Sequence, residues 1–237
     1  MKKAFILAFW VIVGMMNSLY AQTTNTVKYK VTYDAASQTY TAWVVPDYSV
    51  PNTNNAGTSE IGATAQYTLV VPKTFVIQNI TDVKGTWEKA PDKLGQGLIL
   101  NGITQNYGPS VPSDVAFYVI GKSPDETNYG ALVKDQAVAL FTFKSNGCVG
   151  AVRVLPPNDI FITAASSTYS LNVANSFYSR SGQPAGGNVI PKEQFVNVAG
   201  GPALCNGSVI YAYDDNNITN QNTAVSGNVL TNDDGSN

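Results

Sequence analysis

The sequence of 237 residues predicts an all-β fold, an antiparallel β-sandwich. Apolar and polar residues alternate with the period of two that is typical of half-buried strands. The apolar runs are short, and clusters of glycine and proline separate them. Before Pro157, no window of ten or more residues carries a helical period. Many short strands joined by such turns are typical of sandwiches and barrels.

The first two strands are predicted to form a hairpin. In residues 27–33, valine and tyrosine alternate with lysine and threonine, so the apolar side chains share one face. Residues 34–38 follow as a short turn, and residues 39–45 form the second strand. Residues 46–59 are rich in Pro, Asn, Thr and Gly, which predicts a long exposed loop.

The rest of the sandwich is expected to consist of further short strands. The alternation returns in residues 63–71, and other strands are expected at 75–80, 97–100, 115–120, 137–143 and 149–155. Residues 164–180 carry a weaker pattern, in which residues 170–176 are expected to form one or two helical turns. A stretch of about 180 residues is enough for one large sandwich, so we place this domain at residues 22–205.

Residues 1–21 have the layout of a secretory signal peptide. Lys2 and Lys3 precede an apolar run over residues 4–16, and Ala21 stands before a polar segment. The apolar run is shorter than the roughly 20 residues that span a bilayer. We expect cleavage after Ala21, an exported protein that is secreted or at the cell surface, and no membrane span elsewhere.

The mature chain is predicted to be weakly acidic. Without Lys2 and Lys3 it carries 12 basic and 16 acidic residues, a formal charge of −4. Nucleic-acid binding draws on clustered Lys and Arg, so this balance argues against a nucleic-acid partner.

Cys148 and Cys205 are predicted to form a disulfide, because an even pair in an exported protein usually does so. The bond would fasten the last segment of the domain to its core. The alternative is a reactive thiol or a metal ligand, which the complete absence of histidine disfavours.

The absence of histidine also closes most catalytic routes. A Ser-His-Asp triad, a Cys-His pair and a His-ligated zinc site all require it. A glycosidase with two carboxylates stays open on chemical grounds alone. Its candidate carboxylates are Glu60, Asp82, Glu88, Asp92, Asp114, Asp125, Glu126, Asp135 and Asp159. Most of them adjoin a charged, Pro or Asn neighbour in predicted loops, so we expect a protein that is not an enzyme.

Aromatic side chains are the strongest candidates for a binding site. Trp87, Tyr48 and Tyr107 combine an apolar ring with a polar tip, which suits a sugar or a protein partner. Trp87 lies in the segment Lys-Gly-Thr-Trp-Glu-Lys, where it is expected to be exposed on a loop, with a core position as the alternative. Trp43, on the second predicted strand, is expected to lie in the core.

The C-terminal stretch carries a distinctive string. Residues 225–233 read Val-Ser-Gly-Asn-Val-Leu-Thr-Asn-Asp, and Ala-Tyr-Asp-Asp stands at residues 212–215. Residues 212–237 thereby resemble the opening of the cadherin-like or Ig-like tandem repeats of large bacterial surface adhesins. The resemblance implies an acidic, Asn-rich linker at residues 206–223. It also implies the first strand of an incomplete Ig-like β domain at residues 224–237.

The same end of the chain is locally acidic. No Lys or Arg follows Lys192, whereas Asp214, Asp215, Asp233 and Asp234 accumulate. Oxygen ligands from Asp, Asn and backbone carbonyls suit calcium, so these four aspartates are candidate calcium ligands at the junction. The alternative is a solvated acidic linker.

A second resemblance concerns the sandwich itself. Residues 67–72 read Tyr-Thr-Leu-Val-Val-Pro, and residues 139–144 read Ala-Leu-Phe-Thr-Phe-Lys. This part of the chain looks like a cohesin or a related carbohydrate-binding sandwich. The fold is therefore expected to be an Ig-like or a cohesin/jelly-roll-like sandwich.

Together these features predict the non-catalytic extracellular head module of a large cell-surface or secreted adhesin, which acts in adhesion or structural display. Its partners would be other domains of the same long chain, and a glycan or a surface protein. The alternative is a carbohydrate-binding or cohesin-like recruitment module of a secreted polysaccharide-degrading system.

Overall fold

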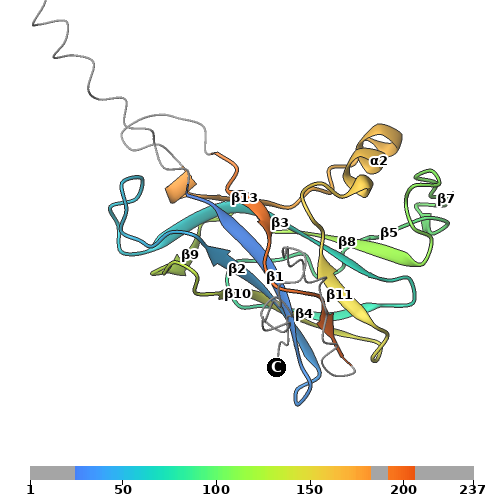
Figure 1. Cartoon of the computed structure of the whole chain (residues 1–237), viewed down its shortest axis with the longest axis horizontal. Helices are drawn as coiled ribbons and strands as arrows, with labels where there is room; N and C mark the ends of the chain where they lie inside the picture. Colours follow the sequence, from blue (N-terminus) through green and yellow to red (C-terminus); the bar gives the residue numbers. More distant parts are fainter. Residues whose placement is uncertain (1–24, 183–191, 206–237) are drawn as a thin grey trace, which may run out of the picture.

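The computed structural model describes residues 25–182 and 192–205, which form an all-β sandwich of two sheets (Figure 1). The first sheet has the order β13-β1-β2-β10-β4 and is built from β1 (Val27–Asp34), β2 (Thr39–Pro46), β4 (Ile77–Asp82), β10 (Val138–Ser145) and β13 (Phe195–Val198). All pairs in this sheet are antiparallel except β1 with β13.

The second sheet is organised around one long strand, β3 (Glu60–Pro72). Its central order is β14-β11-β3-β8-β5, and two further strands, β9 and β12, also pair with β3. The other strands are β5 (Lys93–Leu94), β8 (Val115–Gly121), β9 (Thr127–Gly130), β11 (Ala151–Val154), β12 (Ser176–Ser179) and β14 (Ala203–Leu204). A small hairpin joins β6 (Ile99–Leu100) to β7 (Ile103–Thr104).

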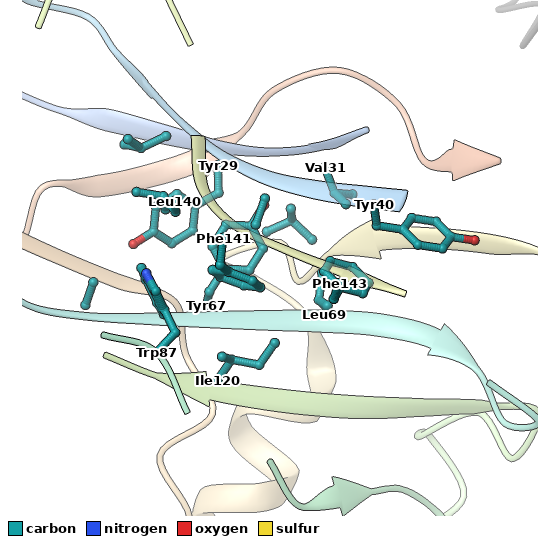
Figure 2. Close-up of a cluster of buried hydrophobic side chains, with 14 of the residues drawn as sticks. Tyr29, Val31, Tyr40, Tyr67, Leu69, Trp87, Ile120, Leu140, Phe141 and Phe143 are labelled. Carbon is teal, nitrogen blue, oxygen red and sulfur yellow. The ribbon is translucent and has the colours of Figure 1, made fainter. Parts of the chain in front are cut away.

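Aromatic side chains fill the space between the two sheets. Figure 2 shows Tyr29 and Phe141 of the first sheet directed towards Tyr67 of the second. The rings of Tyr29 and Tyr67 stack with centroids 4.5 Å apart, and Phe141 meets Tyr67 edge-on at 5.4 Å. Burial of rings of this size supplies a large part of the stabilisation of such a core.

A second, smaller core covers the outer side of the second sheet. The α-helix α2 (Ile160–Tyr169) packs Phe161 on Phe117 of β8 with ring centroids 3.6 Å apart. Val70 of β3 and Tyr107 of the loop after β7 complete this contact. Figure 1 shows α2 and the β6–β7 hairpin near each other at one end of the sandwich. Both faces of β3 are therefore buried over residues 67–71.

The strand predictions are confirmed for the hairpin β1–β2 and for β3, β8, β10 and β11. The helix prediction is wrong in its position, because the helix spans Ile160–Tyr169 and residues 176–179 form β12. Asp159 begins the helix by accepting a hydrogen bond from the N–H of Phe161. Ser170 ends it in the left-handed conformation, with φ of 56°.

The prediction of an exposed loop at residues 46–59 also needs correction. Tyr48, Val50 and Asn55 in this segment are buried. The N–H of Val50 donates to the carbonyl of Leu132, and the Asn54 side chain donates to the carbonyl of Ser181. The segment is therefore packed against distant parts of the chain.

Two buried tyrosines provide a matched test of this core. The Tyr67 hydroxyl donates to the backbone carbonyl of Lys30 at 2.6 Å, whereas the buried Tyr129 hydroxyl has no partner among the described residues. Tyr67→Phe should lower the free energy of unfolding by about 0.5 to 1.5 kcal/mol, because it removes the hydrogen bond that the buried hydroxyl donates. Tyr129→Phe should leave it within about 0.5 kcal/mol of the wild type or raise it. Urea unfolding measures both, and equal losses would contradict the assignment.

Candidate functional site

The structure buries Trp87, which corrects the expectation that it is exposed on a loop. Its side chain is only 2% exposed and packs on Phe141 with ring centroids 4.8 Å apart (Figure 2). The indole N–H donates to the carbonyl of Lys84 at 2.7 Å, so its single polar group is satisfied internally. A β-bridge between Trp87 and Lys122 holds the segment against the second sheet. Trp87 is a core residue.

Tyr48 and Tyr107 are likewise buried and present no binding surface. The Tyr48 hydroxyl accepts a hydrogen bond from the Gln194 side chain at 3.2 Å and lies 3.4 Å from the Ser179 hydroxyl. The Tyr107 hydroxyl donates to the Gln105 side chain at 2.5 Å. Burial, with the nearby Tyr169, raises the pKa of Tyr107 to about 12. All three aromatic candidates are therefore core residues.

The buried carboxylate of Glu60 is committed to a structural network. It accepts hydrogen bonds from the N–H of Ser181 at 3.0 Å and from the Ser181 hydroxyl, and Asn55 donates to it at 3.4 Å. These contacts join the segment at residues 47–59 to η1 (Arg180–Gly182). Because neighbouring groups occupy both oxygens, Glu60 acts as an anchor between distant segments.

Lys122 is a second buried charged residue, and it lies in a separate network from Glu60. Its ammonium donates to the backbone carbonyls of Ala63, Ser123 and Asp125 at 3.1, 2.8 and 2.7 Å. The Asp125 carboxylate lies 3.4 Å away and supplies the countercharge. All three ammonium hydrogens can thus be satisfied by carbonyl oxygens, which makes a burial of this charge tolerable.

The disulfide between Cys148 and Cys205 is present, with the two Cα atoms 5.3 Å apart. The two cysteines flank the strand pair β11–β14, in which Ala151 lies opposite Leu204 and Val152 opposite Ala203. Strand pairing and covalent bond together fasten the end of the described chain to the second sheet. Asp214, Asp215, Asp233 and Asp234, the candidate calcium ligands, lie outside the described residues.

The outward side of the first sheet carries a partly exposed tryptophan. Trp43 of β2 faces away from the core and is partly exposed, which corrects its expected core position. Its indole N–H donates to the Thr32 hydroxyl on β1 at 2.8 Å. This bond reaches diagonally across the strand pair, because Trp43 lies directly opposite Lys30. The indole is thereby fixed as it leans over β1.

A row of threonines runs beside Trp43 across four neighbouring strands. Thr32 of β1 lies opposite Thr41 of β2, Thr41 opposite Thr142 of β10, and Thr142 opposite Thr81 of β4. Directly paired residues project to the same side of a sheet, so these side chains form one line. Each hydroxyl is both a donor and an acceptor of hydrogen bonds.

Three lysines complete this surface. Lys28 and Lys30 are on the outward side of β1, and Lys144 lies on β10 opposite Gln78 of β4. The aliphatic stem of Lys30 passes beside Gly200, within van der Waals reach of a Cβ added there. We call the outward side of the first sheet, with Lys28, Lys30, Thr32, Thr41, Trp43, Thr81, Thr142 and Lys144, the Trp43 face.

One shallow hollow lies elsewhere, at the edge of the second sheet. It has a volume of about 210 Å³ and is lined mainly by apolar groups, with Asp114 and Arg153 at its rim. The Arg153 guanidinium lies 3.6 Å from the Asp159 carboxylate, so its charge is partnered. Trp87, Tyr48 and Tyr107 do not line this hollow, whereas Asp114, one of the nine candidate carboxylates, does.

Comparisons with known proteins found no match to any family model, curated protein or solved structure. The class is therefore defined by the structure itself, as a disulfide-closed all-β sandwich. Across residues 25–182 and 192–205, no group of three or more His, Cys, Asp or Glu side chains is placed to hold a metal ion. No helix among these residues has both the length and the apolar character needed to cross a bilayer.

Trp43 is partly exposed and Trp87 is buried, so the fluorescence of the two side chains should differ in its accessibility to a quencher. Residues 22–237 contain two tryptophans, Trp43 and Trp87, and a protein made of these residues is the one to measure. Acrylamide should quench the part of the emission that comes from Trp43, because only this ring is accessible. Trp43→Phe should remove the quenchable part and leave a protected, blue-shifted emission. Unchanged quenching in this variant would contradict the outward placement of Trp43.

The disulfide should contribute strongly to stability. The bonded cysteines are separated by 57 positions, and closing a loop of that length is worth about 4 kcal/mol in the chain-entropy account. Replacing both cysteines by alanine should lower the free energy of unfolding by an amount of this order in urea. Thiol titration of the native wild type should find no free thiol, and two reactive thiols would contradict the bond.

Proposed function

We propose that this chain is a non-catalytic extracellular module that acts in adhesion or structural display, as the head of a longer cell-surface or secreted protein. The observation that carries the proposal is the fastening of β14 to β11 by strand pairing and by the disulfide. The segment that resembles an adhesin repeat follows this fixed point in the sequence. A rigid sandwich held at its outgoing strand is suited to present a surface at a distance from an anchor.

The buried polar groups favour a non-catalytic role. A buried charge can serve catalysis when it faces a cleft with capacity left for a substrate. Glu60 and Lys122 instead satisfy neighbouring backbone and side-chain groups inside the fold. Of the other candidate carboxylates, Asp82 bonds Lys89 and Asp159 caps α2.

The second candidate function is a carbohydrate-binding or cohesin-like recruitment module of a secreted polysaccharide-degrading system. One observation favours it, namely the outward indole of Trp43 beside a row of hydroxyl groups. The two functions differ in what the rest of the polypeptide contains. Tandem repeats would accompany a head module, whereas a domain with paired catalytic carboxylates would accompany a recruitment module.

The location and context of the module can be measured directly. An antibody raised against residues 22–205 should label the surface of intact cells that produce the protein. In immunoblots it should recognise a polypeptide far larger than 237 residues, whose mass-spectrometric peptides include repeats of the V-x-G-N-V-L-x-N-D opening. Labelling only after permeabilisation, or a large polypeptide with a catalytic domain in place of repeats, would contradict the head-module proposal.

A further inference from the structure

We infer that the Trp43 face binds an acidic polysaccharide, a chain whose sugar rings carry carboxylate or sulfate groups. The inference rests on the proposed function as a non-catalytic extracellular module that acts in adhesion, and it names the class of the ligand. It is carried by three properties of the face: its accessibility, its combination of an indole with hydroxyls, and its charge.

The two sheets differ in what covers their outer sides. On the second sheet, Val70 and Phe117 project outwards but are buried beneath α2 and the loop that carries Tyr107. On the first sheet, the outward positions of the four strands β1, β2, β10 and β4 are partly or fully exposed. No element within the described residues packs over them in the way that α2 packs over Phe117. A surface made of strands also holds its side chains in fixed positions.

The chemistry of the centre of the face fits a sugar chain. An indole offers a broad apolar ring for the C–H groups on one side of a sugar, and Trp43 is held in place by its bond to Thr32. Ala139, directly opposite Trp43 on β10, leaves one side of the ring unobstructed by a large neighbour. Each threonine hydroxyl can donate a hydrogen bond to a sugar hydroxyl or accept one from it.

The charge of the face selects an acidic chain. Lys28, Lys30 and Lys144 have no carboxylate partner among the described ion pairs. Of the two aspartates on the same strands, Asp82 is paired with Lys89, whereas Asp34 accepts hydrogen bonds from its own turn at Ser37 and keeps its charge. The three lysines less Asp34 leave a local excess of two positive charges on a weakly acidic protein, which attracts polyanions over the range of the Debye length.

The spacing of the lysines favours a chain over a single small anion. Lys28 and Lys30 are about 7 Å apart along β1, as expected for alternate residues of a strand. Lys144 lies two strands from β1, about 10 Å across the sheet, and level with Asp34, which is about 13 Å along β1 from Lys30. The positive charges therefore flank the strip of Trp43 and the threonines, where a linear ligand could meet all three. The absence of arginine from this face and the small number of cations disfavour a nucleic acid.

The test is a titration of the mature protein, residues 22–237, with defined polysaccharides. Polygalacturonate, alginate and chondroitin sulfate are the acidic probes, and methyl-esterified polygalacturonate and dextran are the neutral ones. Calorimetry should detect binding of at least one acidic probe, with affinity that falls as the salt concentration rises. Methyl esterification should abolish it. DNA of similar length and anionic lipid vesicles serve as non-carbohydrate polyanions and should bind more weakly.

Matched variants locate the site. Trp43→Thr should weaken binding by about tenfold or more, as expected for a central aromatic contact. Lys28→Ser with Lys30→Ser should weaken it and flatten the salt dependence. Lys134→Ser removes the same charge from an exposed loop outside the face and should leave affinity unchanged. Thermal unfolding of each variant shows that the fold is retained, and the lysine pair stays informative should Trp43→Thr be unstable.

Each other result has a defined meaning. Binding that is equal in the wild type and in both face variants would overturn the assignment of the Trp43 face while leaving a recognition function in place. Equal binding of neutral probes, DNA or vesicles would overturn the selectivity for acidic sugars. No binding to any acidic probe would overturn the inference, whereas the head-module proposal would still be decided by surface labelling and the size of the polypeptide.

Discussion

The structure depends on the packing of tyrosine rings between two sheets, and above all on Tyr29 and Tyr67, whose hydroxyls are hydrogen-bonded inside the fold. Tyr29 and Tyr67 stack across the core, and burial raises the pKa of both hydroxyls well above the usual value. Tyr67 belongs to the second sheet, yet its hydroxyl donates to the carbonyl of Lys30 on the first. The Tyr29 hydroxyl donates in turn to the carbonyl of Ser176, where β12 begins. These two bonds fix the relative position of the sheets.

The bond from Tyr67 also connects the core to the candidate site. It holds the backbone of Lys30, whose side chain points outwards beside Trp43. Thr32, which accepts the indole hydrogen bond, lies two residues further along the same strand. The core therefore helps to position the Trp43 face. The Lys30 carbonyl, which accepts the bond from Tyr67, and the side chains of Lys30 and Thr32 belong to the same strand, β1.

Alternation in the sequence was sufficient to predict the central strands, and it could also have placed Trp43. In β2, Tyr40, Ala42 and Val44 share one side, so Trp43 must share the other with Thr41. Hydrophobicity alone assigned Trp43 to the core, whereas strand periodicity assigns it to the surface. The threonine row is harder to find, because it depends on the pairing of strands distant in sequence and on a register shift in each of the pairs β2–β10 and β10–β4.

Trp87 shows the limit of local reasoning. Its neighbours in sequence are charged or small, and nothing in that segment indicates burial. It is buried because Asp82 accepts its backbone N–H and because the carbonyls around Lys122 hold the adjacent turn on the second sheet. The helix Ile160–Tyr169 was not predicted at its true position for a related reason. Phe161 is buried because its ring stacks on Phe117, more than forty positions earlier in the sequence.

The arrangement separates the surface that would meet a ligand from the point where the chain leaves the sandwich. The Trp43 face belongs to the first sheet, whereas the disulfide fastens β14 to the second. A pulling force between a bound ligand and the following segment would therefore pass through the core, including the bond between Tyr67 and Lys30. A head module that resists such a force needs both the covalent clip at its outgoing strand and a tightly packed interface between its sheets. This chain has both.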